Sequence, residues 1–328
     1  MQSRETSADL WHQKPYYSLD AWCKNTYGRK LYKAALDIGC TCPNRDGTLD
    51  TRGCIFCSAG GSGDFAASRQ LSVTDQLNQA KALLSSKWTP EPGKPSLIAY
   101  FQAYTNTYGD PDRLLSCYEE ALSSPEVAGI SIATRPDCLS DIILEGLDRL
   151  RLLYPDRFIW IELGLQSIHD HTAARIRRGY PTSVFYDAAA KLHAQRLPFI
   201  VHLILGLPGE TRLDLLESIR AVNQVHPFGV KLQLLHILRG TDLALLYESG
   251  KLPVLTQEEY LDLLISCITA LSPNICLHRI TGDGPRKLLI APQWSLSKRN
   301  VLNGLHALMK QRNLRQGDNY EPGTSYTL

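Results

Sequence analysis

The stretch DIGCTCPNRDGTLDTRGCIFCSAGGSGDF, residues 37–65, carries four of the nine cysteines of the chain: Cys40, Cys42, Cys54 and Cys57. Four thiolates would form a closed zinc site, and Cys54 and Cys57, with two residues between them, have the spacing of a zinc knuckle. Cys40 and Cys42 have one residue between them, so an extended chain directs their side chains apart. Three thiolates, from Cys42, Cys54 and Cys57, could instead hold an iron–sulfur cluster with one iron open to a further ligand.

Outward from this segment, short apolar runs alternate with amphipathic stretches. The predicted strands are residues 33–38, 96–101, 128–133, 158–163, 199–205 and 230–235, which are rich in Ile, Leu and Val. Oxygen-bearing residues that cap helices precede the amphipathic stretches: Ser72 or Thr74, Asp110, Ser140, Thr182 or Ser183, and Thr211. Such alternation indicates βαβ units and a parallel sheet.

The units predict an α/β fold: a partial (β/α)6 TIM-type barrel of parallel strands with a small C-terminal helical appendage. Six units are too few for a closed eight-stranded barrel. We expect an N-terminal extension over residues 1–30, the barrel over 31–255 with its cysteine loop at 39–65, and a C-terminal region over 256–328 that packs on the barrel. The last region includes the run NICLHRI and a final helix near 297–311.

Composition favours a globular chain. Of its 328 residues 44% are hydrophobic and 21% are charged, and no apolar run reaches the roughly 18 residues of a membrane helix. The N-terminus is polar and lacks the apolar core of a signal peptide. These features predict a cytoplasmic protein with reduced or metal-bound thiols and no membrane partner.

Polar residues lie at or near the carboxyl ends of several predicted strands, where parallel barrels bind their ligands. They are Gln102, Thr134 with Arg135, Glu162 with Gln166, His202 and His236. The cysteine loop follows the first predicted strand and so belongs to the same rim. Glu162 is left with two interpretations, an ion pair with Arg135 or a ligand contact.

The pattern Cys42-x11-Cys54-x2-Cys57 after a first strand resembles the radical S-adenosylmethionine (SAM) enzymes. Phe56, directly before the last cysteine, occupies a position that is commonly aromatic or apolar there. Further blocks resemble the YhcC/YtqA family, in a branch related to the catalytic subunit of Elongator: CPNRDGT, YFQAYTNTYGD, ISIATRPDCL, IELGLQSIHDHTA, HLILGLPGET, LLHILRGTDL and HRITGDGPRKLLIAPQWS. The family usually has an aromatic residue at the position of Cys40, which indicates that Cys40 is not a ligand.

The resemblance implies a 4Fe–4S cluster on Cys42, Cys54 and Cys57, with SAM on the open iron and reductive cleavage of its C–S bond. It implies an electron donor such as a flavodoxin or ferredoxin. Further residues at matching positions would bind the cofactor: Phe56, Gln102, Thr105, Thr134, Gln166, Arg178 and His202. Gln102 to Thr105 replace the usual Gly-Gly-Glu. Ala133 stands where relatives have a glutamate, so one ribose contact is either missing or supplied by Thr134.

Members of the family that this chain resembles are implicated in maturing the side chain of the modified wobble uridine in tRNA. Two features of the residues agree with an RNA substrate: aromatic residues at 100, 101, 104 and 108, and a basic region from 285 to 315 without an acidic residue. We therefore expect a tRNA-modifying radical SAM enzyme. Two alternatives stay open: a radical SAM enzyme acting on a small molecule, and a non-catalytic, zinc-stabilised nucleic-acid-binding protein.

Overall fold

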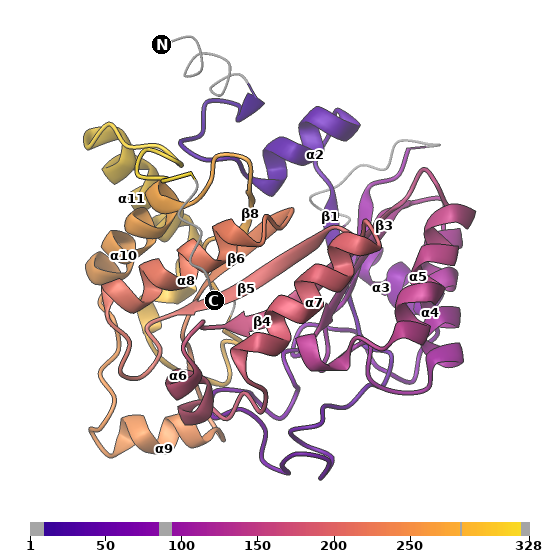
Figure 1. Cartoon of the computed structure of the whole chain (residues 1–328), viewed down its shortest axis with the longest axis horizontal. Helices are drawn as coiled ribbons and strands as arrows, with labels where there is room; N and C mark the ends of the chain where they lie inside the picture. The colour runs from indigo at the N-terminus through magenta and orange to yellow at the C-terminus, as the bar shows by residue number, and fades with distance from the viewer. Residues whose placement is uncertain (1–9, 85–93, 283, 323–328) are drawn as a thin grey trace. The chain divides into compact units, whose positions relative to one another are not determined.

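The computed structural model describes residues 10–84, 94–282 and 284–322 (Figure 1). It separates into two compact units built from discontinuous segments. Residues 29–164 and 183–199 form the first, here called the cysteine unit, and residues 1–28, 165–182 and 200–328 form the second, here called the terminal unit. The predicted N-terminal extension lies partly outside the described residues. Among those that are described, no helix has the length and apolar character needed to cross a membrane.

The fold is an α/β partial barrel with seven parallel strands, which confirms the predicted class. Six of the strands correspond to the predicted runs. The seventh, β8 (Cys276–Arg279), comes from the run NICLHRI, which the sequence analysis assigned to the C-terminal region outside the barrel. The barrel strands therefore extend into the C-terminal part of the chain.

In the cysteine unit, β1 (Tyr32–Leu36), β2 (Leu97–Phe101), β3 (Val127–Thr134) and β4 (Phe158–Gln166), whose last two residues belong to the terminal unit, pair in chain order and in parallel. Leu36 is in register with Phe101, and Phe101 with Ile132. The segments that follow these residues therefore leave the sheet at one edge, as the sequence predicts.

The two faces of these four strands differ in chemistry. One face carries rows of aliphatic and aromatic residues, and its Phe101 packs edge-on against Tyr118 of α4 (Pro111–Ser123), with ring centroids 5.0 Å apart. The other face carries Lys33, Tyr100 and Ser131 among apolar neighbours, together with Trp160 and Glu162 of β4. The helix-covered face is thus apolar, while the opposite face carries polar and charged side chains as well.

Helices α3 (Val73–Leu84), α4, α5 (Asp141–Leu153) and α7 (Thr182–Ala194) follow the predicted amphipathic stretches. Asp110 and Ser140 cap α4 and α5 as expected, and Ser72, rather than Thr74, accepts from Asp75 N at the start of α3. Thr182 is the first residue of α7, and its hydroxyl donates to the Ile168 carbonyl instead of capping the helix. A short 3₁₀ turn, Pro136–Cys138, follows β3.

In the terminal unit, β5 (Phe199–Leu205), β6 (Gly229–Leu234) and β8 pair in parallel, and β7 (Ile237–Leu238) and β9 (Leu289–Ala291) form a small antiparallel ribbon. Helix α10 (Gln257–Ala270) packs between α8 (Arg212–Gln224) and α11 (Lys298–Gln311) (Figure 1). The remaining elements are α2 (Leu19–Tyr27), α6 (Asp170–Arg175), α9 (Asp242–Glu248) and a 3₁₀ turn at Gln293–Leu296. Thr211 and Thr256 are the N-caps of α8 and α10, and each forms a capping box.

The N-terminal segment is held by residues from the far end of the chain. Leu277 N donates to Tyr17 O at 2.7 Å, and Gln316 N donates to Pro15 O at 2.9 Å. The buried Gln316 side chain accepts from Tyr17 N and donates to the carbonyls of Ser272 and Ile275. One glutamine therefore joins the N-terminal segment to the loop that precedes β8.

Candidate metal centre

The cysteine loop leaves β1 and folds so that its two halves meet. Arg45 N donates to Cys42 O at 2.7 Å, and Cys57 N donates to Cys54 O at 3.0 Å, so a tight turn surrounds each cysteine position. Gly53 N donates to Asn44 O at 2.7 Å and ties the second half to the first. The loop thereby brings Cys42 to Cys54 and Cys57 across the eleven residues that separate them.

The electrostatics of the thiols separate three cysteines from the fourth. Burial raises the pKa of Cys54 to about 12, and negative charge on Cys57 and on Cys42 adds to the rise. The pKa of Cys57 is likewise raised by burial, and Cys42 acts in the same direction. Cys40 is buried elsewhere: burial raises its pKa to about 11, and its charged neighbours are Arg113, Asp37 and Cys117. The charges of Cys42, Cys54 and Cys57 therefore act on one another, whereas the charged groups that act on Cys40 are Arg113, Asp37 and Cys117.

This donor set fits an iron–sulfur cluster. Soft thiolates select zinc, copper(I) and iron–sulfur clusters, and thiolates that repel one another in a half-buried site are stabilised when a cationic centre takes their charge. All three thiols are half-buried, so the group has one side towards solvent. A set of three leaves room for a further ligand, which a closed four-thiolate site would not.

A second loop closes on the far end of the cysteine loop. Tyr104 has a left-handed backbone, with φ of 61°, and its hydroxyl donates to Ala59 O at 2.5 Å. A Cβ on Gly61 would lie 2.2 Å from the Tyr104 ring, so only glycine allows this contact. The segment GGSG and the segment QAYTN after β2 therefore form one packed layer beside the cysteines.

The predicted cofactor residues of the cysteine unit lie around this loop. Gln102 donates to Ser62 O at 2.7 Å, and Thr105 N donates to Thr41 O at 3.2 Å, so both support the loop. Thr134 is buried, with its hydroxyl 2.5 Å from that of Thr107, and Phe56 is half-buried. A contact of each with SAM stays a prediction.

Gln166, Arg178 and His202 belong to the terminal unit. Gln166 ends β4 with a φ of 68°, and among the described residues its buried Oε1 has no hydrogen-bond partner. The buried Arg178 guanidinium donates to Leu165 O, Ser167 O and Tyr180 O, so it supports the backbone on both sides of Gln166. His202 is half-buried in β5. Their contacts with SAM likewise stay predictions.

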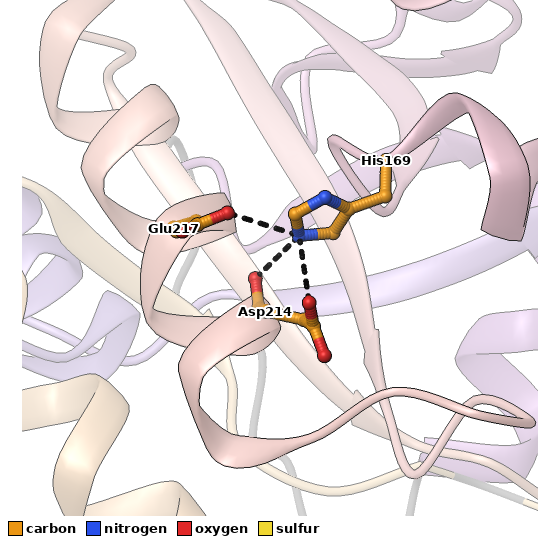
Figure 2. A group of neighbouring side chains, drawn as sticks. All are labelled: His169, Asp214 and Glu217. Carbon is orange, nitrogen blue, oxygen red and sulfur yellow. Dashed lines mark hydrogen bonds and ion pairs between the residues drawn. The ribbon is translucent and has the colours of Figure 1, made fainter.

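A network that the sequence analysis did not identify fixes the segment after Gln166. Figure 2 shows His169 Nε2 facing helix α8, 3.0 Å from Asp214 O, 3.8 Å from Asp214 Oδ1 and 3.6 Å from Glu217 Oε2. A carbonyl only accepts, so the short contact requires the tautomer with its proton on Nε2, which cannot bind a metal through that atom. We therefore interpret the group as a tether. Ile168 N donates to Ser218 Oγ on the same helix at 3.2 Å.

Lys33 was not among the residues predicted from the sequence. Its ammonium lies 2.9 Å from Glu162 Oε1 and 4.4 Å from the centre of the Tyr100 ring. Ser131 donates to the same Glu162 oxygen at 2.6 Å. Glu162 therefore pairs with Lys33, while Arg135 makes its ion pair with Asp137. A charged residue inside the otherwise apolar strand YKAAL was the available signal.

The aromatic residues noted in the sequence are mostly engaged. Tyr100 and Phe101 are buried, and Tyr104 packs on Gly61. Tyr108 is half-buried, with its hydroxyl 2.9 Å from that of Thr48. They are packing residues of the sheet and of the cysteine loop, which removes them as an argument for stacking with bases.

Comparison with known proteins gives two family matches: the Radical SAM superfamily over residues 42–222 and the Radical SAM C-terminal domain over residues 227–311. The chain is 40% identical over 305 residues to the uncharacterized protein YtqA of Bacillus subtilis, covering 93% of this chain and 92% of that one. It is 37% identical over 272 residues to protein YhcC of Escherichia coli, covering 82% and 84%.

Similarity to Elongator complex protein 3 is more distant. The human protein is 25% identical over 169 residues, which is 49% of this chain and 29% of that protein. Among solved structures, the archaeal Methanocaldococcus infernus Elp3 with an N-terminal deletion matches with a TM-score of 0.64 and 16% identity, covering 87% of this chain and 64% of that one. Methylornithine synthase matches with a TM-score of 0.51 and 13% identity, covering 96% and 90%. These two structures share the fold.

Proposed function

Because this chain belongs to the radical SAM superfamily, whose cofactors are a 4Fe–4S cluster and SAM, we propose that Cys42, Cys54 and Cys57 hold the cluster and that the enzyme modifies tRNA. The observation that carries the ligand assignment is the grouping of these three thiols, with Cys40 apart beside Arg113. The match to the family model begins at Cys42.

When bound, the reduced cluster and SAM supply a 5′-deoxyadenosyl radical, and the chain supplies orientation and exclusion of water. Gln166 Oε1 is a buried acceptor without a hydrogen-bond partner among the residues that the structure describes, and it is suited to a ribose hydroxyl or the methionyl amine. Arg178 holds the backbone around it. Gln102 and Thr105 support the cysteine loop that SAM would approach.

The proposed substrate is a side chain on the wobble uridine of tRNA. Support comes from the similarity to Elongator complex protein 3 and from the basic region of the terminal unit. Five of its cations are exposed: Arg286, Lys287, Arg299, Lys310 and Arg312. Exposed Lys and Arg side chains can neutralise phosphates of RNA. The electron donor is proposed to be a flavodoxin or ferredoxin, and the site of action the cytoplasm.

The ligand assignment is tested by iron content after anaerobic reconstitution, in the wild type and in alanine variants of Cys40, Cys42, Cys54 and Cys57. We expect about four irons per chain, retained by Cys40→Ala and lost or depleted in the other three variants. Formation of 5′-deoxyadenosine under reduction should follow the same order. One bound zinc, with equal dependence on all four cysteines, would refute the assignment.

The substrate is tested by tRNA binding across a salt series. If all five exposed cations contact phosphates, the slope of log K against log salt should be about −4. Arg299→Ala and Lys310→Ala should each reduce it by about one, while the exposed Lys251→Ala serves as the matched control. Nucleoside analysis of tRNA after turnover then reports the modified base. Turnover on a small molecule with no change in tRNA would overturn this part of the proposal alone.

A further inference from the structure

We propose that Asn44, Arg45 and Arg135 form a donor shell around the cysteines, one residue for each, and that this shell sets the reduction potential of the cluster. The inference rests on the proposed cysteine ligands. It assigns to three residues outside the ligand set a positioning and tuning role that the sequence analysis did not consider.

Each cysteine has its own neighbour. The buried Asn44 directs Nδ2 to Cys54 Sγ at 3.5 Å, and the buried Arg135 directs Nη1 to Cys42 Sγ at 3.9 Å. Arg45 donates through Nη2 to Cys57 O at 2.7 Å and Ser58 O at 2.8 Å. The three donors come from two elements, the first turn of the cysteine loop and the segment after β3.

Two further residues, Asp137 and Gly53, help to position the arginines of the shell. Asp137 fixes Arg135 with two bonds, 2.9 Å to Nε and 2.7 Å to Nη2. Gly53 has a φ of 74°, and a Cβ there would lie 2.7 Å from Arg45 Nε, so the glycine makes room for the guanidinium. Asn44 and Arg45, shortly after Cys42, thus supply donors, and Gly53, directly before Cys54, supplies the space that Arg45 needs.

The electrostatic consequence has a definite sign. Reduction adds an electron to the cluster, and N–H donors and positive charge beside the sulfurs stabilise the reduced form. Arg45 and Arg135 therefore raise the reduction potential, and Asp137 opposes Arg135. A unit charge roughly 10 Å from the cluster centre at an effective dielectric constant of about 20 changes the reduced-to-oxidised ratio on the order of tenfold, or about 59 mV for one electron.

The test is an EPR-monitored redox titration of the reconstituted full chain, with variants that differ in charge and little in shape. Arg45→Gln and Arg135→Gln should lower the reduction potential, and Asp137→Asn should raise it. Each variant should change the ratio of reduced to oxidised cluster by about tenfold. Arg45→Lys keeps the charge but loses the paired carbonyl bonds, so its potential should stay nearer the wild type than that of Arg45→Gln. A purely structural role would not produce shifts of opposite sign.

Iron content separates the two proposals. If the variants bind about four irons and their potentials are unchanged, or all shift in one direction, the donor shell is refuted and the cysteine assignment stands. If the wild type does not bind about four irons, both fall. Should Arg135→Gln fail to fold, Arg45→Gln against Asp137→Asn still compares removal of a positive and of a negative charge.

Discussion

The ion pair between Lys33 and Glu162 should be asymmetric in its effect on stability. Glu162 is fully buried, whereas the Lys33 side chain is 20% exposed. Removing one partner of a buried pair costs about 3–5 kcal/mol because the other charge is left without compensation. Lys33→Met leaves the Glu162 carboxylate without its counter-ion. Ser131 still donates to that carboxylate, and water can enter at the lysine position. We expect a loss of about 3 kcal/mol in the free energy of unfolding, at the lower end of that range.

Glu162→Gln leaves the Lys33 ammonium without its counter-ion. That ammonium can reach water and still lies over the Tyr100 ring at 4.4 Å, so the loss in the free energy of unfolding should be about 1 kcal/mol. The double variant removes both charges and should be more stable than Lys33→Met alone. The double-mutant cycle should give a coupling of about 1–3 kcal/mol. Urea denaturation followed by circular dichroism under anaerobic conditions measures all four proteins. Additive losses, or a double variant less stable than Lys33→Met, would refute the reasoning.

Two further predictions concern the second loop and the terminal unit. Gly61→Ala should lower the free energy of unfolding, measured by urea denaturation, by at least about 1 kcal/mol more than Gly240→Ala does. Both glycines have left-handed backbones, but only a Cβ on Gly61 would meet a side chain, the Tyr104 ring at 2.2 Å. Equal losses for the two variants would contradict this. Burial, with Lys298 and Arg279, lowers the pKa of His236 from 6.5 to about 4. The unfolded chain therefore binds a proton that the folded chain does not, so stability should fall as pH decreases from about 6.5 to 4, and His236→Gln should flatten that slope; an unchanged slope would contradict this.

Local features of the fold were predictable from the sequence. Asp110, Ser140 and Thr211 cap helices because a cap needs only a side-chain oxygen and the amides two or three residues later. The six apolar runs were also predictable from local sequence, because their composition is typical of strands buried in a parallel sheet. β8 was missed because NICLHRI is short, and its polar end reads as a loop without the neighbouring strand.

Features that depend on register or on loop conformation were not predictable. Lys33 and Glu162 are 129 residues apart, and only the pairing of β1 to β4 brings them together. Arg45 reaches Cys57 because Gly53, which has no Cβ, leaves room for its guanidinium, and a sequence motif does not specify that packing. The grouping of Cys42, Cys54 and Cys57 was predicted by resemblance, while the spacing alone left the zinc alternative open.

The bonds of Gln316 to the N-terminal segment bear on how the chain folds during synthesis. Tyr17 N and the Gln316 side chain are 299 residues apart. At the usual rate of translation, about 5–20 residues per second, residues 15–17 wait roughly 15–60 s before this partner is made. In that interval the cysteine loop and its strands have already left the ribosome. On stalled nascent chains, we expect the residues of the cysteine loop to be protected from protease at shorter chain lengths than the N-terminal segment.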